Sequence, residues 1–199
     1  MMKERNVDLA YQRVTKADLP IMISLYDEYL NGGDSSTVHL RKAIAEDGYI
    51  GVKCIDRAQG DRFVGVFSCL PGICFTYAHP ELEAFVESRW GGTKLYSGDI
   101  LVVLPDYRGY GVARELTKQL RIALVQEGVQ NLLVEMWNPL NLGDLPAGGI
   151  MKYLGKFSWI QDMPDFYKDL YAHGMTCPDC GDGPCRCGAT VGMIPLMDQ

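Results

Sequence analysis

The sequence lacks a long hydrophobic run, and no apolar stretch approaches the ~18 residues that a membrane-spanning helix needs. Residues 1–6 are polar and lack the apolar core of a secretory signal peptide. Lysine and arginine form no cluster, and the formal net charge is −6. A nucleic-acid partner is therefore not expected. These absences together lead us to expect a cytoplasmic protein with neither a membrane nor a nucleic-acid partner.

What is present is the composition of a globular protein, with 47% apolar and 22% charged residues. A chain of 199 residues suits one domain, or one domain with an appendage. The three histidines form no recognisable catalytic triad, and we expect them at the surface.

The strongest local signal lies in residues 99–116. Residues 100–104 are apolar and rich in β-branched side chains, which predicts a strand buried on both faces. Beyond them, apolar residues recur at the helical spacing of four, at Val112, Leu116, Leu120 and Leu124. Residues 108–113 then form a glycine-rich turn between strand and helix. Its free N–H groups and the positive end of the helix dipole would bind phosphate.

Glycines could serve such a turn without any ligand, so the surrounding spacing matters. A dinucleotide site needs Gly-x-Gly-x-x-Gly, and the third residue after Gly111 is Arg114, which disfavours that site. The pattern Val103-x-Pro105-x-x-Arg108-Gly-x-Gly111-x-Ala113, followed by Leu116, resembles the acyl-coenzyme A signature of the GNAT N-acetyltransferases.

The resemblance implies an α/β fold in which helices flank a mixed, splayed sheet. It implies acetyl-CoA as cosubstrate and direct transfer of the acetyl group to a primary amine of a small molecule or protein. The resemblance also leaves open that the protein forms a homodimer. The implied coenzyme contacts are Leu101, Val102, Val103, Arg108, Gly109, Tyr110, Gly111, Val112, Ala113 and Asn138. A non-catalytic acyl-CoA-binding or partner-docking module is the alternative function.

Hydrophobic patterning predicts the other elements that this fold requires. Strands are expected over residues 8–14, 49–55, 63–69, 131–137, 157–160 and 163–170. Helices are expected after a capping box at residues 15–18, from Ser35 or Ser36 to Glu46, over residues 80–90, and after an Asp144 cap.

Tyr153 is the candidate general acid. It precedes Gly155 and Phe157 at the end of a predicted helix, which resembles the family's helix ending in Tyr followed by Gly-Phe. The family places its glycine and phenylalanine further from the tyrosine, so simple packing at a helix end stays an alternative for Tyr153. Tyr167 and Tyr171 are spare candidates for the same role.

Asp99 and Glu135 are the candidate bases, because each lies on a strand that flanks the expected cleft. Two-residue alternation places Asp99 on the strand face of Leu101 and Val103. Glu135 is a single charge in an apolar run, which is costly unless it faces water, a partner or the site. A solvated strand-end carboxylate is the alternative for Asp99, and ordered water could replace either base.

Four of the seven cysteines crowd together at Cys177, Cys180, Cys185 and Cys187. The run Cys-Pro-x-Cys-Gly resembles a zinc knuckle, and four thiolates satisfy tetrahedral Zn²⁺ in a closed, structural site. Two disulfides, a redox-active thiol cluster and an iron–sulfur cluster are the alternatives. We therefore expect an acyltransferase domain over residues 1–170 and a small Cys-rich, zinc-binding tail over residues 171–199.

Overall fold

The computed structural model describes residues 6–30, 44, 48–141, 148–173, 176–181 and 183–197. The strands are β1 (Leu9–Arg13), β2 (Ile50–Asp56), β3 (Arg62–Pro71), β4 (Leu95–Val103), β5 (Asn131–Asn138), β6 (Trp159–Met163) and β7 (Gly188–Pro195). The helices are α1 (Leu19–Leu30), α3 (Pro80–Trp90), α4 (Val112–Gln126) and α5 (Gly148–Met151). Short 3-10 turns are η1 (Lys16–Asp18), η2 (Arg57–Gln59), η3 (Pro105–Tyr107) and η4 (Leu170–His173).

Two of the expected helices fall wholly or partly outside this part of the chain. The helix expected up to Glu46 lies outside the described residues except for Ile44, and the Asp144 cap lies outside them as well. Within the described ranges, no helix is long and apolar enough to span a bilayer.

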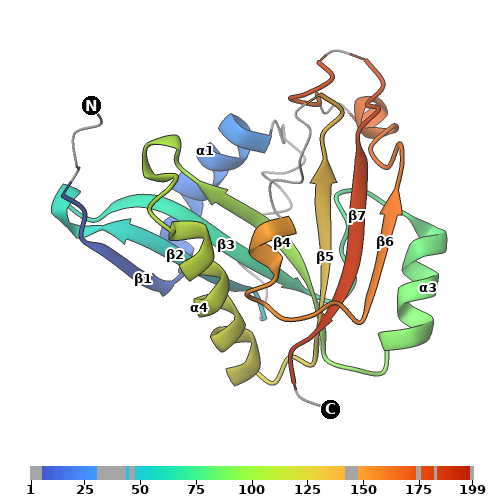
Figure 1. Cartoon of the computed structure of the whole chain (residues 1–199), viewed down its shortest axis with the longest axis horizontal. Coiled ribbons are helices and arrows are strands. Elements are labelled where there is room, and N and C mark those ends of the chain that lie inside the picture. The colour runs from blue at the N-terminus through green and yellow to red at the C-terminus, as the bar shows by residue number, and fades with distance from the viewer. Residues whose placement is uncertain are drawn as a thin grey trace.

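The strands form one mixed sheet in the order β1-β2-β3-β4-β5-β7-β6 (Figure 1). Neighbouring strands pair antiparallel except β4 and β5, which run parallel. The pairing of β4 with β5 covers only Leu95 to Ser97 and Asn131 to Leu133. Beyond this short ladder the two strands diverge (Figure 1). The predicted splayed sheet is confirmed.

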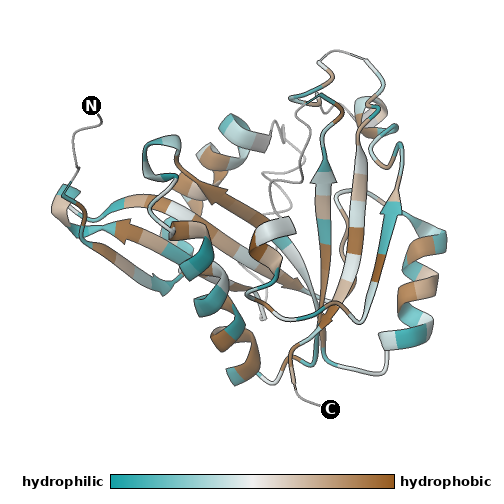
Figure 2. Cartoon of the chain, viewed as in Figure 1, coloured by the Kyte–Doolittle hydropathy of each residue, from teal (hydrophilic) through white to brown (hydrophobic). Residues whose placement is uncertain are grey.

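Helices cover both faces of the sheet. Leu116, Leu120 and Leu124 give α4 a buried stripe against one face, as their spacing of four predicts. Figure 2 shows that α4 carries both hydrophobic and hydrophilic residues, as an amphipathic helix does. On the other face, Met22 of α1 packs with Ile100 and Val102 of β4, and α3 packs against β5. We call these the α4 face and the α1/α3 face.

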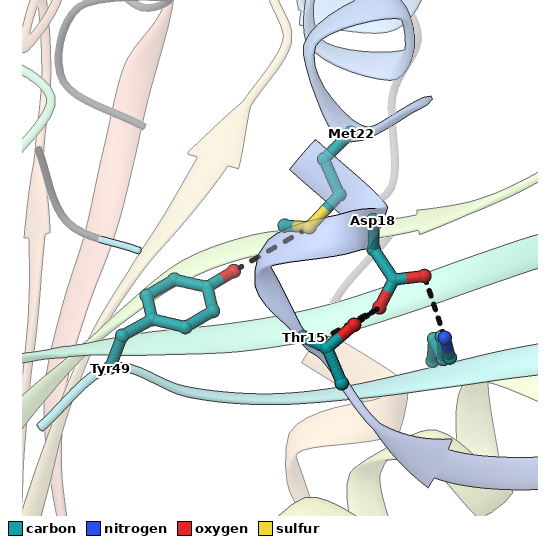
Figure 3. Close-up of polar contacts among 5 residues, drawn as sticks. Thr15, Asp18, Met22 and Tyr49 are labelled. Atoms are coloured by element: carbon teal, nitrogen blue, oxygen red, sulfur yellow. Dashed lines mark hydrogen bonds and ion pairs between the residues drawn. The ribbon is translucent and has the colours of Figure 1, made fainter. Parts of the chain in front are cut away.

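The start of α1 is tied to the sheet on the α1/α3 face. The Thr15 N–H and Oγ1 donate to the Asp18 carboxylate at 2.8 and 2.9 Å, and the Lys53 ammonium of β2 lies 2.6 Å from it. One turn later, the Tyr49 hydroxyl lies 3.9 Å from the Met22 sulfur (Figure 3). The helix signal at residues 15–18 is therefore confirmed, with a 3-10 turn as its first part.

The C-terminal region differs from the expectation. The strand expected over residues 163–170 is wrong, because Pro164 and the positive φ of Asp165 (51°) follow β6 directly and turn the chain. The last strand is β7, which pairs with β5 on one side and β6 on the other. A boundary at residue 170 would place this inner strand in the tail. Residues 188–195 therefore belong to the sheet.

Candidate active site

The opening between β4 and β5 is the centre of the candidate site. The last ladder pair is Ser97 with Leu133. Asp99 and Glu135 each lie two residues further along their strands, one on either side of the opening. The two candidate bases therefore flank the point where the sheet splits.

The glycine-rich turn begins where β4 ends. The Arg108 Nε donates to the Val103 carbonyl oxygen at 3.3 Å, which ties the turn back to the strand. Gly109 and Gly111 have φ values of 85° and 79°, in the left-handed region that favours glycine. Tyr110, between them, is exposed. The turn thus has the conformation that its glycines predict, and it lies open to solvent.

The first turn of α4 follows Gly111 at once. Its first N–H groups, including those of Val112 and Ala113, have no partner within the helix, and the N-cap residue Gly111 has no side chain to cap them. A Cβ at Gly111 would lie 3.1 Å from the Arg114 guanidinium, so this turn carries a second cation in addition to Arg108. Free amides, the positive helix end and two guanidinium groups suit a polyanion such as a pyrophosphate.

A buried hydrogen bond that sequence reasoning missed supports this turn. Tyr107 in η3 is fully buried, and its hydroxyl donates to the Asp56 carboxylate at 2.9 Å. The same carboxylate accepts from the Asp8 and Ala58 amides at the end of β2. An aspartate at a strand end is common in turns, so the pattern alone could not have distinguished this anchor.

The other predicted coenzyme residues line the α4 face only in part. Leu101 and Val103 pack against the core beneath α4, whereas the Val102 side chain points to the α1/α3 face. Asn138 donates from Nδ2 to Thr190 at 2.9 Å. Its buried Oδ1 has no hydrogen-bond partner among the described residues. An unpaired buried amide oxygen near the opening fits a contact with a bound ligand.

A β-bulge changes the predicted orientation of Asp99. Phe67 pairs with Leu101 and Cys69 with Gly98, so Ser68 alone faces both Asp99 and Ile100. The extra residue breaks the two-residue alternation. Asp99 accepts hydrogen bonds from the Tyr26 hydroxyl of α1 at 2.5 Å and from Ser68 at 3.1 Å. The prediction that Asp99 shares the face of Leu101 and Val103 is therefore wrong.

Glu135 is also held on the α1/α3 face. Its carboxylate accepts from the Thr76 N–H at 3.0 Å, the Thr76 hydroxyl at 2.5 Å and the Tyr167 hydroxyl at 2.6 Å. Burial raises the pKa of Glu135, and these three hydrogen bonds oppose the rise without cancelling it. The structure thus explains the lone charge in β5: it is satisfied by partners from two loops.

Cys74 lies beside the end of the β4–β5 ladder. Its N–H donates to the Ser97 hydroxyl at 2.9 Å, at the last position of the β4–β5 ladder. Burial, and then the charges of Asp99 and Glu135, raise the pKa of its thiol to about 11. The Asp99 and Glu135 carboxylates both lie on the α1/α3 face, the first against Tyr26 and the second against Tyr167.

An aromatic group stands beside Glu135, and it includes a histidine that we expected at the surface. The His79 ring stacks on Phe166 with centroids 3.9 Å apart, and Tyr77 lies 4.3 Å from it. The Nε2 of His79 is buried without a partner among the described residues. His79 is therefore half-buried, and its ring packs among aromatic side chains where we expected a surface position.

Tyr153 lies on the α4 side, one turn beyond α5. Its ring is half-buried, with the ammonium groups of Lys152 and Lys118 at 5.3 and 5.8 Å from the ring centroid. The next carbonyl, of Leu154, accepts from Arg121 of α4 at 2.8 Å. The candidate acid and the candidate bases therefore approach the sheet from opposite faces. The side chain of Tyr171, a spare candidate acid, is 54% exposed.

Comparison with solved structures identifies this architecture. The chain is similar to Arabidopsis thaliana NAA60 in complex with a bisubstrate analogue (13% identity, TM-score 0.66), with 94% of this chain and 98% of that one covered. It is also similar to a chain from Desulfovibrio desulfuricans assigned to the GNAT family (13%, TM-score 0.58, 96% and 100% covered). The chain has the GNAT fold.

A third similar structure is an aminoglycoside 6'-N-acetyltransferase complexed with coenzyme A (13%, TM-score 0.59, 96% and 98% covered). Neither the protein-family models nor the curated proteins match this sequence. The resemblance in residues 103–116 and the arrangement in space thus agree on the GNAT fold although overall identity is low.

The GNAT fold of this chain also carries a compact four-cysteine cluster. The Cys177, Cys180, Cys185 and Cys187 sulfurs all lie within 4.8 Å of one another, and three of their separations are 3.7, 3.5 and 3.9 Å. Four sulfurs bound to one zinc ion at ~2.3 Å would stand about 3.8 Å apart. The Arg186 and Cys187 amides point at the Cys180 and Cys185 sulfurs.

The cluster is built into the core of the GNAT fold. Cys177, Cys185 and Cys187 are buried in the same apolar cluster as Leu133 and Phe166. Cys187 is followed at once by β7. A tail that merely hangs from the fold would not share this packing.

Proposed function

We propose that this GNAT-fold chain is an acetyl-CoA-dependent N-acetyltransferase that moves the acetyl group directly to a primary amine of a small molecule or a protein. The observation that carries this proposal is the opening between β4 and β5. The glycine-rich turn and Tyr153 stand on one face, and two carboxylates stand on the other. The comparison proteins crystallised with coenzyme A or a bisubstrate analogue support the same reaction class.

The coenzyme would lie on the α4 face. The amides of residues 109–113 with Arg108 and Arg114 would hold the pyrophosphate. The unpaired Asn138 Oδ1 would accept from an amide of the pantetheine arm, and Leu101 would line the arm. Two substrates held in register on opposite faces of the sheet can supply much of the rate by proximity.

The chemistry needs one acceptor and one donor of protons. The amine nitrogen forms a bond to the thioester carbonyl carbon, and the carbon–sulfur bond breaks. Glu135 accepts the proton that the amine loses, while the Tyr153 hydroxyl protonates the departing thiolate. Asp99 on the same face as Glu135 would attract the ammonium form of the amine before it reacts.

The test is release of free coenzyme A from acetyl-CoA across a panel of amines: aminoglycosides, polyamines, lysine-containing peptides and peptides with free N-termini. At least one class should raise coenzyme release well above hydrolysis, with the acetylated amine seen by mass spectrometry. Binding of acetyl-CoA without transfer to any of these amines would favour the non-catalytic module instead.

We also propose that the four cysteines hold one structural Zn²⁺. Tetrahedral sulfur spacing and the backbone amides aimed at sulfur support this metal over disulfides. Purified protein should contain one zinc per chain, and Cys180→Ser should lose it, because three thiolates leave the tetrahedron open to water. A metal analysis with no zinc, together with four reactive thiols, would exclude the site.

A further inference from the structure

One tyrosine connects the four-cysteine cluster to the candidate base. The Tyr167 N–H donates to the Cys187 carbonyl oxygen at 3.4 Å. The hydroxyl of the same residue donates to the Glu135 carboxylate at 2.6 Å. Tyr167 is 6% exposed, so its ring has little freedom to leave this position. A single buried residue thus spans the two sites, through its main-chain N–H at one end and its hydroxyl at the other.

The sheet provides a second connection. Cys187 leads directly into β7, whose Gly188 pairs with Asn138 and whose Val191 pairs with Glu135. A displacement of the cysteine loop would therefore move the start of β7, the strand that pairs with β5. The Tyr167 connection runs to the α1/α3 face, where Glu135 accepts its hydrogen bonds, and the β7 connection also passes Asn138, a predicted coenzyme contact.

The coenzyme turn has its own anchor. It depends on the Tyr107–Asp56 hydrogen bond and on the start of α4, and neither involves the cysteine loop. The glycine-rich turn and the Glu135 side of the opening are consequently supported by different parts of the chain. Changes at the cysteines should reach the amine side and spare this turn.

We infer that a metal ion held by the four cysteines positions Tyr167, and through its hydroxyl positions Glu135, so that metal loading controls the amine step of transfer far more than coenzyme binding. This inference rests on the proposed function. Tyr167 is here a positioning residue, because it acts on the amine through Glu135.

The experiment compares the full chain with zinc bound and after chelation, below the melting transition of the metal-free form. Hydrogen exchange should quicken at the amides of Tyr167 and Thr76 and stay unchanged at the start of α4. The Kd for acetyl-CoA should change less than about 2-fold, whereas kcat/KM for the amine should fall at least about 10-fold. If chelation weakened acetyl-CoA binding by the same factor as it lowered kcat/KM for the amine, the inference would be overturned.

A variant separates positioning from general folding. Tyr167→Phe keeps the ring and the backbone bond but removes the hydroxyl. It should retain zinc and coenzyme affinity, lower kcat by about 10-fold or more, and become insensitive to zinc removal, because coupled changes are not additive. Tyr96→Phe, at a tyrosine of β4 that is similarly buried (4% exposed), is the matched control and should behave as the parent.

Two outcomes would contradict the inference: normal turnover in Tyr167→Phe, or the same proportional loss on zinc removal in this variant as in the parent. If the zinc-bound parent acetylates no amine at all, the proposed function fails. The exchange measurement then decides the inference, since it reports the link from the cysteine loop to Thr76 without any turnover.

Discussion

Glu135 shows how a single side chain can be costly in the fold and useful in the site. It stands in an apolar strand, where an unpaired charge would be strongly unfavourable. Thr76 and Tyr167 supply three donors to its carboxylate, yet burial still raises its pKa. A carboxylate with a raised pKa is a stronger base for an amine proton than an ordinary glutamate is.

The direction of this shift predicts the pH dependence of turnover. The base must be ionised, and a raised pKa means that Glu135 stays protonated to a higher pH than the ~4.3 of a free glutamate. kcat/KM should therefore fall as pH falls through the raised pKa. Glu135→Gln should remove this acid limb and lower kcat by about 10²-fold or more. A pH profile of Glu81→Gln, an exposed glutamate of α3, is the control. An acid limb that persists in Glu135→Gln would assign the base elsewhere.

Tyr153 carries the second prediction at the scale of one residue. If its hydroxyl protonates the departing thiolate, Tyr153→Phe should lower kcat by about 10²-fold and leave the acetyl-CoA Kd near the parent value. Steady-state kinetics with calorimetric titration of acetyl-CoA would measure both. Unchanged turnover would return Tyr153 to the role of a packing residue and leave Tyr167 or water as the proton source.

At the scale of elements, the β4 bulge decides which face each side chain of the strand reaches. Strict alternation would send Asp99 toward α4, and the extra residue opposite Ser68 sends it toward α1 instead. The same bulge leaves Ile100 and Val102 on the α1/α3 face and Leu101 on the α4 face. One inserted residue thus separates the carboxylate from the coenzyme side.

The turn between β4 and α4 yields a prediction with a strain-matched control. Gly111→Asp should weaken acetyl-CoA binding by about 10²-fold or more, because it adds negative charge among the free amides at the helix start. Gly128→Asp places the same residue at a comparable φ, 73° against 79°, at the far end of α4. Gly128→Asp should lower the free energy of unfolding by about as much as Gly111→Asp does and should leave the affinity for acetyl-CoA intact. Equal loss of affinity in both variants would mean that strain, not phosphate recognition, explains the effect.

At the scale of the whole molecule, the cysteine loop and the sheet form one unit. β7 is hydrogen-bonded between β5 and β6, and it begins at the residue after Cys187. Cys177 and Cys185 pack in the same cluster as Leu82 of α3. Metal binding to the folded form should therefore stabilise the domain as a whole.

Zinc removal should lower the melting temperature of a single cooperative transition. Calorimetry of the chain with and without a chelator measures this change. Added acetyl-CoA should raise the melting temperature of both the zinc-bound and the zinc-free form. A separate low-temperature transition for the tail, with the main transition unmoved, would instead support the division of the chain at residue 170.

The sequence by itself determined the signature turn, the strand and helix on either side of it, and the four-cysteine spacing. These are local features, set by glycine conformation, apolar periodicity and ligand spacing over a few residues. Only the tertiary structure decided the face of Asp99, the partners of Glu135, and the place of β7 inside the sheet. Each of these depends on contacts between residues far apart in the chain, such as Tyr26 with Asp99 and Tyr167 with Glu135, which no local pattern encodes.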